Sequence, residues 1–311
     1  MKKKILNNLS QLGPLIGLII IVIILGFTSD SFFTLNNILN LLRQISINAL
    51  IAFGMTFVIL TGGIDLSVGS ILAFGSALTA GMLSSGMDPM LAVFIGLLAG
   101  LLMGAMNGLI ITKGKVAPFI ATLATMTIFR GATLVYTEGR PITGLSDSFS
   151  FEMIGKGYVF GIPFPVILML IAFGVLFFIL RNTVFGRQVY SIGGNEEASI
   201  LSGIRADRVK IWVYSITGML SVLAGIILTS RLNSAQPTAG TMYELDAIAA
   251  VVLGGTSLTG GRGWITGTLI GALIIGVLDN GLNLLNVSSF YQQIVKGGVI
   301  LLAVVLDRRS K

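Results

Sequence analysis

The sequence contains neither cysteine nor histidine, and charged residues make up only 11% of its 311 positions. The missing cysteines exclude disulfides and thiolate nucleophiles, and the missing histidines exclude imidazole relays and the usual zinc sites. A soluble globular chain carries roughly 25% charged residues. Because 54% of this chain is hydrophobic and so little of it is charged, it needs lipid to cover its surface.

The sequence also lacks any G-x-x-x-x-G-K-[ST] phosphate loop, and no residue set resembles a nucleophile–base pair or a metal centre. We therefore expect a chain that is not an enzyme, with no catalytic residues, no metal and no bound cofactor. If ATP drives its activity, ATP and magnesium must bind a separate ATPase chain. The net charge of +7 does not indicate nucleic acid, because the basic residues lie in short loops between apolar runs.

Long apolar runs are plentiful, and a transmembrane helix needs about 20 residues. The predicted spans are 12–28, 38–60, 66–84, 90–112, 116–136, 163–180, 211–230, 245–258, 264–285 and 290–306. With 40 glycines, which are common where membrane helices pack closely, the composition favours a helical bundle over a barrel. The fold class predicted is an all-α polytopic transmembrane bundle of about ten spans, forming one domain over residues 1–311.

The Lys and Arg residues of the loops are distributed unequally between the two sides of this predicted bundle. With a cytoplasmic N-terminus, fourteen of them lie on the cytoplasmic side and three on the outer side. This bias follows the positive-inside rule and predicts that both termini are cytoplasmic. Two connections are long, an outer one at 137–162 and a highly charged inner one at 181–210, where a short amphipathic surface helix is expected after a Gly-Gly break.

A short internal echo predicts a duplicated architecture. The segment 61–69 matches 259–267 at Thr-Gly-Gly and at the final glycine. Weak internal similarity of this kind is typical of transporters built by duplication. Six predicted spans separate the copies and place both on the same side, so either the repeat is not inverted or one span is a broken or re-entrant segment.

Polar and charged residues inside the apolar regions are candidates for a translocation pathway, because such residues are costly in lipid and often functional. The candidates are Gly62, Gly63, Asp65, Ser67, Asn107, Thr122, Arg130 and Asp279. Simpler roles compete with this one. Asp65 can instead cap the third helix, and Arg130, Asp279 and Lys296 can snorkel or form an ion pair with one another.

Four glycines recur at every fourth residue of one predicted span. They are Gly96, Gly100, Gly104 and Gly108. This spacing lays a smooth groove along one helix face, so we expect the four glycines to serve helix packing.

Four segments carry a resemblance to a known family. They are Thr61-Gly62-Gly63-Ile64-Asp65-Leu66-Ser67-Val68-Gly69, Pro118-Phe119-Ile120-Ala121-Thr122-Leu123, Gly186-Arg187-Gln188-Val189-Tyr190-Ser191-Ile192-Gly193-Gly194-Asn195 and Val251-Val252-Leu253-Gly254-Gly255-Thr256-Ser257-Leu258. Over nearly its whole length the chain resembles the permease subunits of bacterial ATP-binding-cassette importers for ribose and related monosaccharides.

The resemblance implies that the loop at 181–210 couples the permease to an ATPase. Permeases of such importers carry a sequence Glu-Ala-Ala, three residues, Gly, which Glu197-Ala198-Ser199 and Gly203 match with Ser in place of the second Ala. The expected coupling residues are Asn195, Glu196, Glu197, Ala198, Ser199 and Gly203. On a continuous helix Glu197, Leu201 and Ile204 share one face.

The resemblance further implies a permease homodimer in the bacterial cytoplasmic (inner) membrane, two ATPase chains and a separate extracytoplasmic sugar-binding protein. Ribose is the favoured cargo. Two alternatives stay open: a permease for branched-chain amino acids or nucleosides, and an autonomous ion-coupled secondary transporter that uses Asp65 and Asp279.

Overall fold

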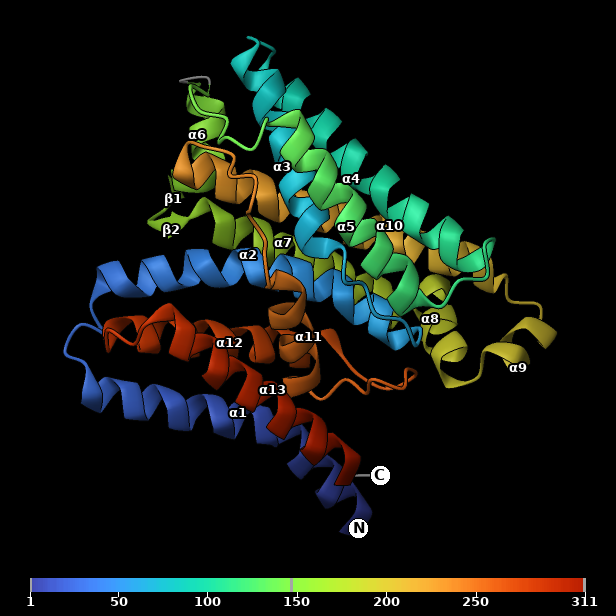
Figure 1. Ribbon diagram of the computed structural model, residues 1–311. Coiled ribbons are helices and arrows are strands. Elements are labelled where there is room, and N and C mark those ends of the chain that lie inside the picture. Colours follow the sequence, from blue (N-terminus) through green and yellow to red (C-terminus); the bar gives the residue numbers. More distant parts are fainter. Residues whose placement is uncertain (1, 146–147, 310–311) are drawn as a thin grey trace.

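The fold was established from a computed structural model, which describes residues 2–145 and 148–309. The regular secondary structure in these parts is almost entirely helical (Figure 1). The helices are α1 (Lys2–Thr28), α2 (Leu35–Leu60), α3 (Val68–Ser84), α4 (Pro89–Thr112), α5 (Pro118–Tyr136), α6 (Phe149–Lys156), α7 (Phe164–Asn182), α8 (Val184–Gly194), α9 (Glu196–Leu201), α10 (Ala206–Leu232), α11 (Tyr243–Leu253), α12 (Ile265–Leu284) and α13 (Ser289–Arg309). A hairpin of β1 (Tyr158–Val159) and β2 (Ile162–Pro163) joins α6 to α7.

Six helices in the described residues are long and apolar enough to cross a membrane: α2, α4, α5, α7, α10 and α12. Residues 13–28 of α1 and the whole of α3 form shorter apolar helices. The chain is thus a polytopic helical membrane protein, as its apolar runs predict. Ten full spans are not confirmed.

Helix α11 is where the predicted span at 245–258 differs from the structure. It has 11 residues, hence a length of about 16 Å, whereas the hydrocarbon core of a bilayer is about 30 Å thick. The preceding residues 233–242 are not helical, and Gly255 beyond its C-terminus has a φ of +84°. Helix α11 is therefore too short to cross a bilayer alone, so residues 245–258 do not form the helical span predicted for them, and the broken-span option left open by the internal echo stays a prediction.

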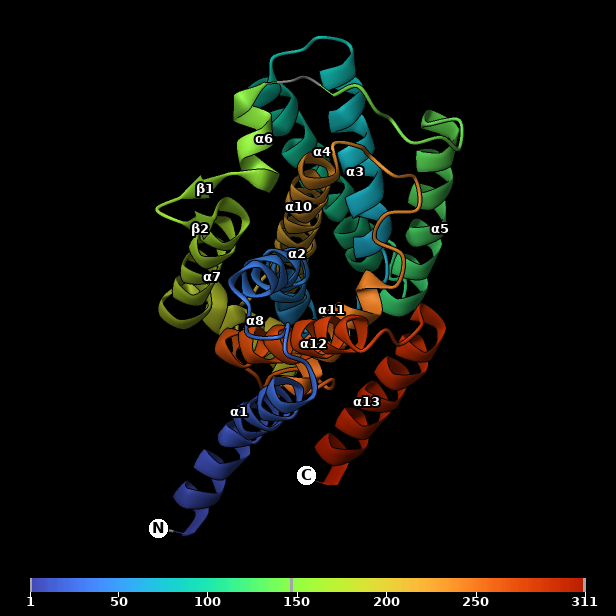
Figure 2. The same cartoon turned by 90° about the vertical axis from the view of Figure 1, so that its left-hand side faces the viewer.

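Helix α10 lies among α2, α3 and α4, and many of its side chains are fully buried (Figure 2). The glycines of α4 allow α10 to pack closely against α4. A Cβ on Gly104 would overlap the backbone of Tyr214, and one on Gly108 would overlap the backbone of Ile211. Gly100 lies against Gly218 and Val222 of α10. The stripe on α4, which begins at Gly96 beside Thr79 of α3, lets the α4 and α10 backbones pack closely.

Helices α11, α12 and α13 form a second group, with α1 packed against α12 (Figure 1). A charged triad joins three of these helices. The Nζ atom of Lys296 on α13 lies 3.0 Å from an oxygen of Asp246 on α11 and 2.9 Å from an oxygen of Asp279 on α12. Both carboxylates are almost fully buried, so each depends on the same ammonium group for its partner.

The connection at 137–162 contains α6 and the hairpin, neither of which the sequence patterns predict. Ser230 of α10 fixes α6 in place. Its hydroxyl donates to the carbonyl oxygen of Phe151 at 2.6 Å and accepts from the backbone N–H of Gly155 at 3.0 Å. Phe151 itself is buried, so α6 packs onto the end of α10 as part of the bundle.

Candidate translocation and coupling sites

Three glycine-rich segments meet where α2 ends, and we call this meeting point the glycine junction. Two of them are the echoed Thr-Gly-Gly segments at 61–63 and 259–261, and the third is Gly193-Gly194 of α8. The backbone N–H of Gly261 donates to the carbonyl oxygen of Leu60 at 3.0 Å. A Cβ on Gly193 would overlap this carbonyl and the nitrogen of Gly261. The two copies of the echo therefore touch each other and the start of the predicted coupling segment.

Helix α9 lies where the sequence predicts a short surface helix within 181–210, but the predicted Gly-Gly break is wrong, because Gly193 and Gly194 are the last residues of α8. The break between α8 and α9 is Asn195, whose side chain accepts from the backbone N–H of Ala198 at 2.9 Å and so begins α9. Ser199 is buried and exchanges a hydrogen bond with Ser191 of α8 at 2.8 Å. Tyr190 donates its hydroxyl to the carbonyl oxygen of Gly263 at 2.7 Å, which binds α8 to the turn before α12.

The face predicted for Glu197, Leu201 and Ile204 is wrong at its last member. Helix α9 ends at Leu201, and Gly203 takes a φ of +85°, which turns the chain before Ile204. What projects instead is Leu201, which is 89% exposed, with the exposed Glu197 one turn earlier. An exposed leucine on a short surface helix is a candidate contact residue for a partner protein.

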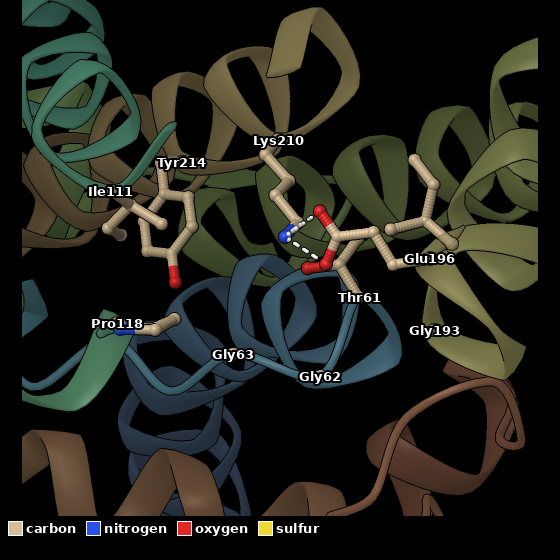
Figure 3. Close-up of a pocket in the computed structure, with 10 residues that line it drawn as sticks. Thr61, Gly62, Gly63, Ile111, Pro118, Gly193, Glu196, Lys210 and Tyr214 are labelled. Atoms are coloured by element: carbon tan, nitrogen blue, oxygen red, sulfur yellow. Dashed lines mark hydrogen bonds and ion pairs between the residues drawn. The ribbon is translucent and has the colours of Figure 1, made fainter. Parts of the chain in front are cut away.

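A cavity of about 270 Å³ lies between the glycine junction and α10 (Figure 3). Lys210 of α10 closes one side, and its Nζ atom donates to both carboxylate oxygens of Glu196 at 2.6 and 2.7 Å. On the other side the hydroxyl of Tyr214 points toward Gly63 and Pro118 (Figure 3). Gly62 and Gly63 thus line a polar cavity beside the coupling segment.

Asp65 lies in the turn between α2 and α3 and is fully buried. One of its oxygens accepts from the backbone N–H of Ser67 at 2.9 Å and from the Ser67 hydroxyl at 2.6 Å. Ser67 is the residue before α3, so Asp65 fixes the entry to the helix and is not its N-cap. Burial raises the pKa of Asp65 to about 6, and the hydrogen bonds from Ser67 oppose that shift.

Asn107 and Thr122 lie in the same buried region as Asp65. Asn107 of α4 donates to the Ser67 hydroxyl at 2.7 Å, and the Thr122 hydroxyl of α5 lies 3.2 Å from the carbonyl oxygen of Ile64. Within the described residues, the second oxygen of Asp65, the amide oxygen of Asn107 and the hydroxyl of Tyr214 have no hydrogen-bond partner. The hydrogen bonds of Asn107 and Thr122 tie the α2–α3 turn to α4 and α5.

Arg130 and Asp279, the remaining pathway candidates, lie away from this region. Arg130 of α5 donates to the carbonyl oxygens of Pro237 and Ala239 at 2.8 and 2.9 Å. It thereby satisfies backbone groups in the non-helical stretch before α11, which have no helical partner. Asp279 pairs with Lys296, as the ion-pair alternative predicts. The sequence patterns missed Asp246, since no spacing rule links it to Lys296 fifty residues later.

One side of the molecule differs in its exposed side chains from the rest. Helices α5 and α13 flank α11 there (Figure 2). The exposed positions along α5, the α11 approach and α13 are mostly apolar, as at Ile128, Leu134 and Ile294, but they also include Thr127, Thr241 and Gln293. The exposed positions along α4 and through residue 178 of α7 are apolar or glycine. We call the side formed by α5, residues 238–245 and α13 the polar face, because polar groups, which avoid lipid, are exposed there among the apolar ones.

Comparison with known proteins places the chain among permeases. The ribose import permease protein RbsC of Bacillus subtilis (strain 168) is 66% identical over 302 residues, which cover 97% of this chain and 94% of that protein. The ribose import permease protein RbsC of Escherichia coli (strain K12) is 54% identical, with coverages of 97% and 95%. The D-allose transport system permease protein AlsC of the same strain is 44% identical, with coverages of 95% and 91%.

No solved structure matches the chain at a significant level. Residues 37–304 match the family described as branched-chain amino acid transport system / permease component. This match spans the bundle from α2 to α13, including the glycine junction, the coupling segment and the polar face. The chain belongs to that permease family.

Proposed function

We propose that the chain is the membrane-spanning permease subunit of an ATP-binding-cassette importer that carries ribose. The observation that carries this proposal is the 66% identity, over nearly the full length of both chains, to a ribose import permease. Identity falls to 44% for a D-allose permease and 36% for an L-arabinose permease. This order favours ribose over other monosaccharides, and over the branched-chain amino acids in the family's description.

The energy for transport comes from separate ATPase chains that dock on α8 and α9. The sequence holds no phosphate loop. The exposed Leu201 and Glu197 offer an apolar anchor beside a charge, which suits a groove on an ATPase surface. Helix α8 contacts Leu60 and Gly261 at the glycine junction. A displacement of α9 is therefore transmitted both to the C-terminal end of α2 and to the turn before α12.

The translocation path lies at the polar face, between two copies of this chain. Polar groups exposed at membrane depth need water or a protein partner, and a second copy provides both a partner and the other wall of a pore. Arg130 lies on α5, which forms part of this face, and Asp279 of α12 pairs with Lys296 of α13, which also forms part of it. Asp65, Ser67, Asn107 and Thr122 support the turn between α2 and α3. An extracytoplasmic binding protein would deliver the sugar at the opposite end from α9.

Both termini lie in the cytoplasm, and the chain crosses the membrane ten times if the partial helix α11 and its non-helical approach count as one crossing. The excess of basic residues in the loops on one side supports this topology. Because the sequence has no cysteine, single cysteines introduced at Lys115 and Phe160 can be labelled with an impermeant maleimide without any background. Labelling of Phe160→Cys in intact cells and of Lys115→Cys only after permeabilisation is expected, and the reverse would contradict the topology.

The cargo is tested by complementation. A bacterial strain that lacks its own ribose permease but keeps the partner proteins is supplied with this chain, and uptake of labelled ribose, leucine and uridine is measured. Ribose accumulation alone is expected. Accumulation of leucine or uridine without ribose would favour the amino-acid or nucleoside alternative.

A further inference from the structure

A second cavity lies beside the C-terminal end of α9. It has a volume of about 520 Å³ and is bounded by the α4–α5 turn, α9 and the start of α10, which lie at the same end of the molecule (Figure 1). The residues that line it are Lys113, Ile200, Gly203, Ile204, Arg205, Ala206, Asp207 and Arg208. We call it the basic groove.

The charge of the basic groove is positive. Three of its lining residues are cationic and one is anionic, which leaves a net charge of +2. Asp207 is paired with Lys113, at 2.6 Å between Nζ and Oδ2, and both side chains are about half exposed or more. Arg205 and Arg208 are exposed and carry the excess charge. An exposed pair such as Lys113–Asp207 is weak, so it does not prevent Lys113 from binding an additional anion.

Two exposed apolar side chains lie one helical turn beyond the groove, one on α4 and one on α10. Gly108 of α4 lies against Ile211 of α10, so the residues next to this contact lie at a similar depth. Leu109, one turn before Lys113, is 47% exposed, and Trp212, one turn after Arg208, is 56% exposed. Tryptophan is typical of the level of lipid headgroups, where an apolar ring meets a wet surface.

We propose that the basic groove binds the phosphate headgroup of an anionic phospholipid, whose acyl chains run along Leu109 and Trp212. The vertical order of the side chains matches the chemistry of such a lipid: Lys113, Arg205 and Arg208 at headgroup level, and apolar side chains one turn deeper. The lipid would contact the hinge between α9 and α10 at Gly203 and Ile204. It would therefore stabilise the position of the coupling segment relative to the bundle.

The sequence provides a direct probe, because Trp212 is one of only two tryptophans and the other, Trp264, can be replaced. The Trp264→Phe protein is reconstituted in vesicles of phosphatidylcholine and phosphatidylglycerol. One of the two lipids is brominated near the headgroup end of its acyl chains. Bromine quenches tryptophan fluorescence on contact. At equal mole fraction, brominated phosphatidylglycerol is expected to occupy the site on the order of tenfold more often than brominated phosphatidylcholine, given two net charges.

Two triple variants separate a specific site from general surface charge. Replacing Lys113, Arg205 and Arg208 by Gln in the Trp264→Phe protein is expected to make quenching by the two lipids equal. Replacing the exposed Arg181, Arg187 and Arg262 by Gln removes the same net charge from other places and is expected to preserve the preference. Equal quenching in the Trp264→Phe protein itself, or loss of the preference in both triple variants, would overturn the proposal.

Two additions identify the occupant. Millimolar inorganic phosphate is expected to leave the lipid preference unchanged, and its abolition by free phosphate would overturn the lipid assignment in favour of a soluble anion. Added ATPase subunit is likewise expected not to displace the lipid; loss of quenching on its addition would make the groove part of the protein interface. These experiments need neither transport nor a known cargo, so their failure leaves the proposed importer function untouched.

Discussion

Lys210 on α10 holds Glu196, the first residue of α9, through two hydrogen bonds of 2.6 and 2.7 Å (Figure 3). This contact is a direct side-chain link between the predicted coupling segment and the core helix that packs on α2, α3 and α4. Glu196 is nearly half exposed, so the pair contributes no more than about 1 kcal/mol to folding. Its main effect is on the orientation of α9.

Replacing Glu196 by Gln is therefore expected to leave the protein folded and to weaken coupling. The amide keeps the size of the side chain but loses the charge that attracts Lys210. In the assembled transporter, the ribose-stimulated ATPase rate is expected to fall several-fold while the melting temperature of the isolated permease changes little. Wild-type stimulation would show that the Lys210–Glu196 contact has no part in coupling.

Glu197 is the matched neighbour, exposed on α9 and placed at the proposed ATPase contact. Reversing its charge with Glu197→Lys is expected to leave insertion and folding intact and to abolish ATPase-coupled uptake, because the reversed charge opposes docking. Co-purification of the ATPase with the variant measures docking directly. Wild-type transport by Glu197→Lys would remove the coupling role of this residue.

The glycine junction offers a pair of substitutions with opposite expected outcomes. A Cβ on Gly193 would overlap the carbonyl of Leu60, whereas a Cβ on Gly194 meets no heavy atom within 4 Å. Gly193→Ala is expected to push α8 off the end of α2, to lower the free energy of unfolding by about 1 to 3 kcal/mol and to impair transport. Gly194→Ala is expected to be near neutral. Thermal unfolding in detergent and uptake assays compare the two, and equal behaviour would contradict close packing at this point.

The Lys296 triad predicts a large effect on stability. Lys296→Met leaves Asp246 and Asp279 buried without a cation, which is expected to cost about 3 kcal/mol of folding free energy. The triple variant Lys296→Met, Asp246→Asn, Asp279→Asn removes all three charges and is expected to recover most of the loss. A stable single variant, or a triple variant no better than the single one, would show that the pairs do not stabilise the α11–α12–α13 group.

Asp65 predicts a pH dependence. Its pKa is raised by burial to about 6 from an ordinary value of 3.8, so the folded state binds a proton more tightly than the unfolded state. Stability is therefore expected to fall as the pH rises through the window between these values and to level off above it, by a total of at most about 3 kcal/mol.

The comparison that isolates this effect is Asp65→Asn, which cannot ionise and still accepts from Ser67. The melting temperature of the wild type relative to Asp65→Asn is expected to decrease from pH 4 to pH 7. A difference that stays constant across this range would mean that Asp65 is not the titrating group.

The membrane-spanning character of most helices could be predicted because the desolvation cost of each residue in lipid is local. A long run of apolar residues predicts a membrane span regardless of the rest of the sequence. The same criterion overestimated the length of α11, which ends at Leu253. The predicted span continues through Gly254, Gly255 and two hydroxyl residues to Leu258, but the chain turns at Gly254-Gly255, and average hydropathy does not indicate where a helix ends.

The contacts that join distant segments could not be predicted in this way. Leu60, Gly193 and Gly261 lie in contact although they are far apart in the sequence. The Thr-Gly-Gly echo was the one sequence feature that related two of these segments to each other. The cap role proposed for Asp65 was close in position but wrong in partner. Asp65 accepts hydrogen bonds from Ser67, which is itself the N-cap residue of α3, and the Ser67 hydroxyl also accepts from Asn107 of α4, a contact that no local sequence pattern indicates.

The central claim, that this chain is a permease dependent on separate ATPase chains, is tested most directly by ribose uptake into proteoliposomes. Uptake is expected only when the permease, its ATPase subunits, ATP inside the vesicles and a ribose-loaded binding protein outside them are all present, and no uptake is expected in a sodium or proton gradient without the ATPase. Gradient-driven ribose accumulation by the chain with no ATPase present would contradict the central claim.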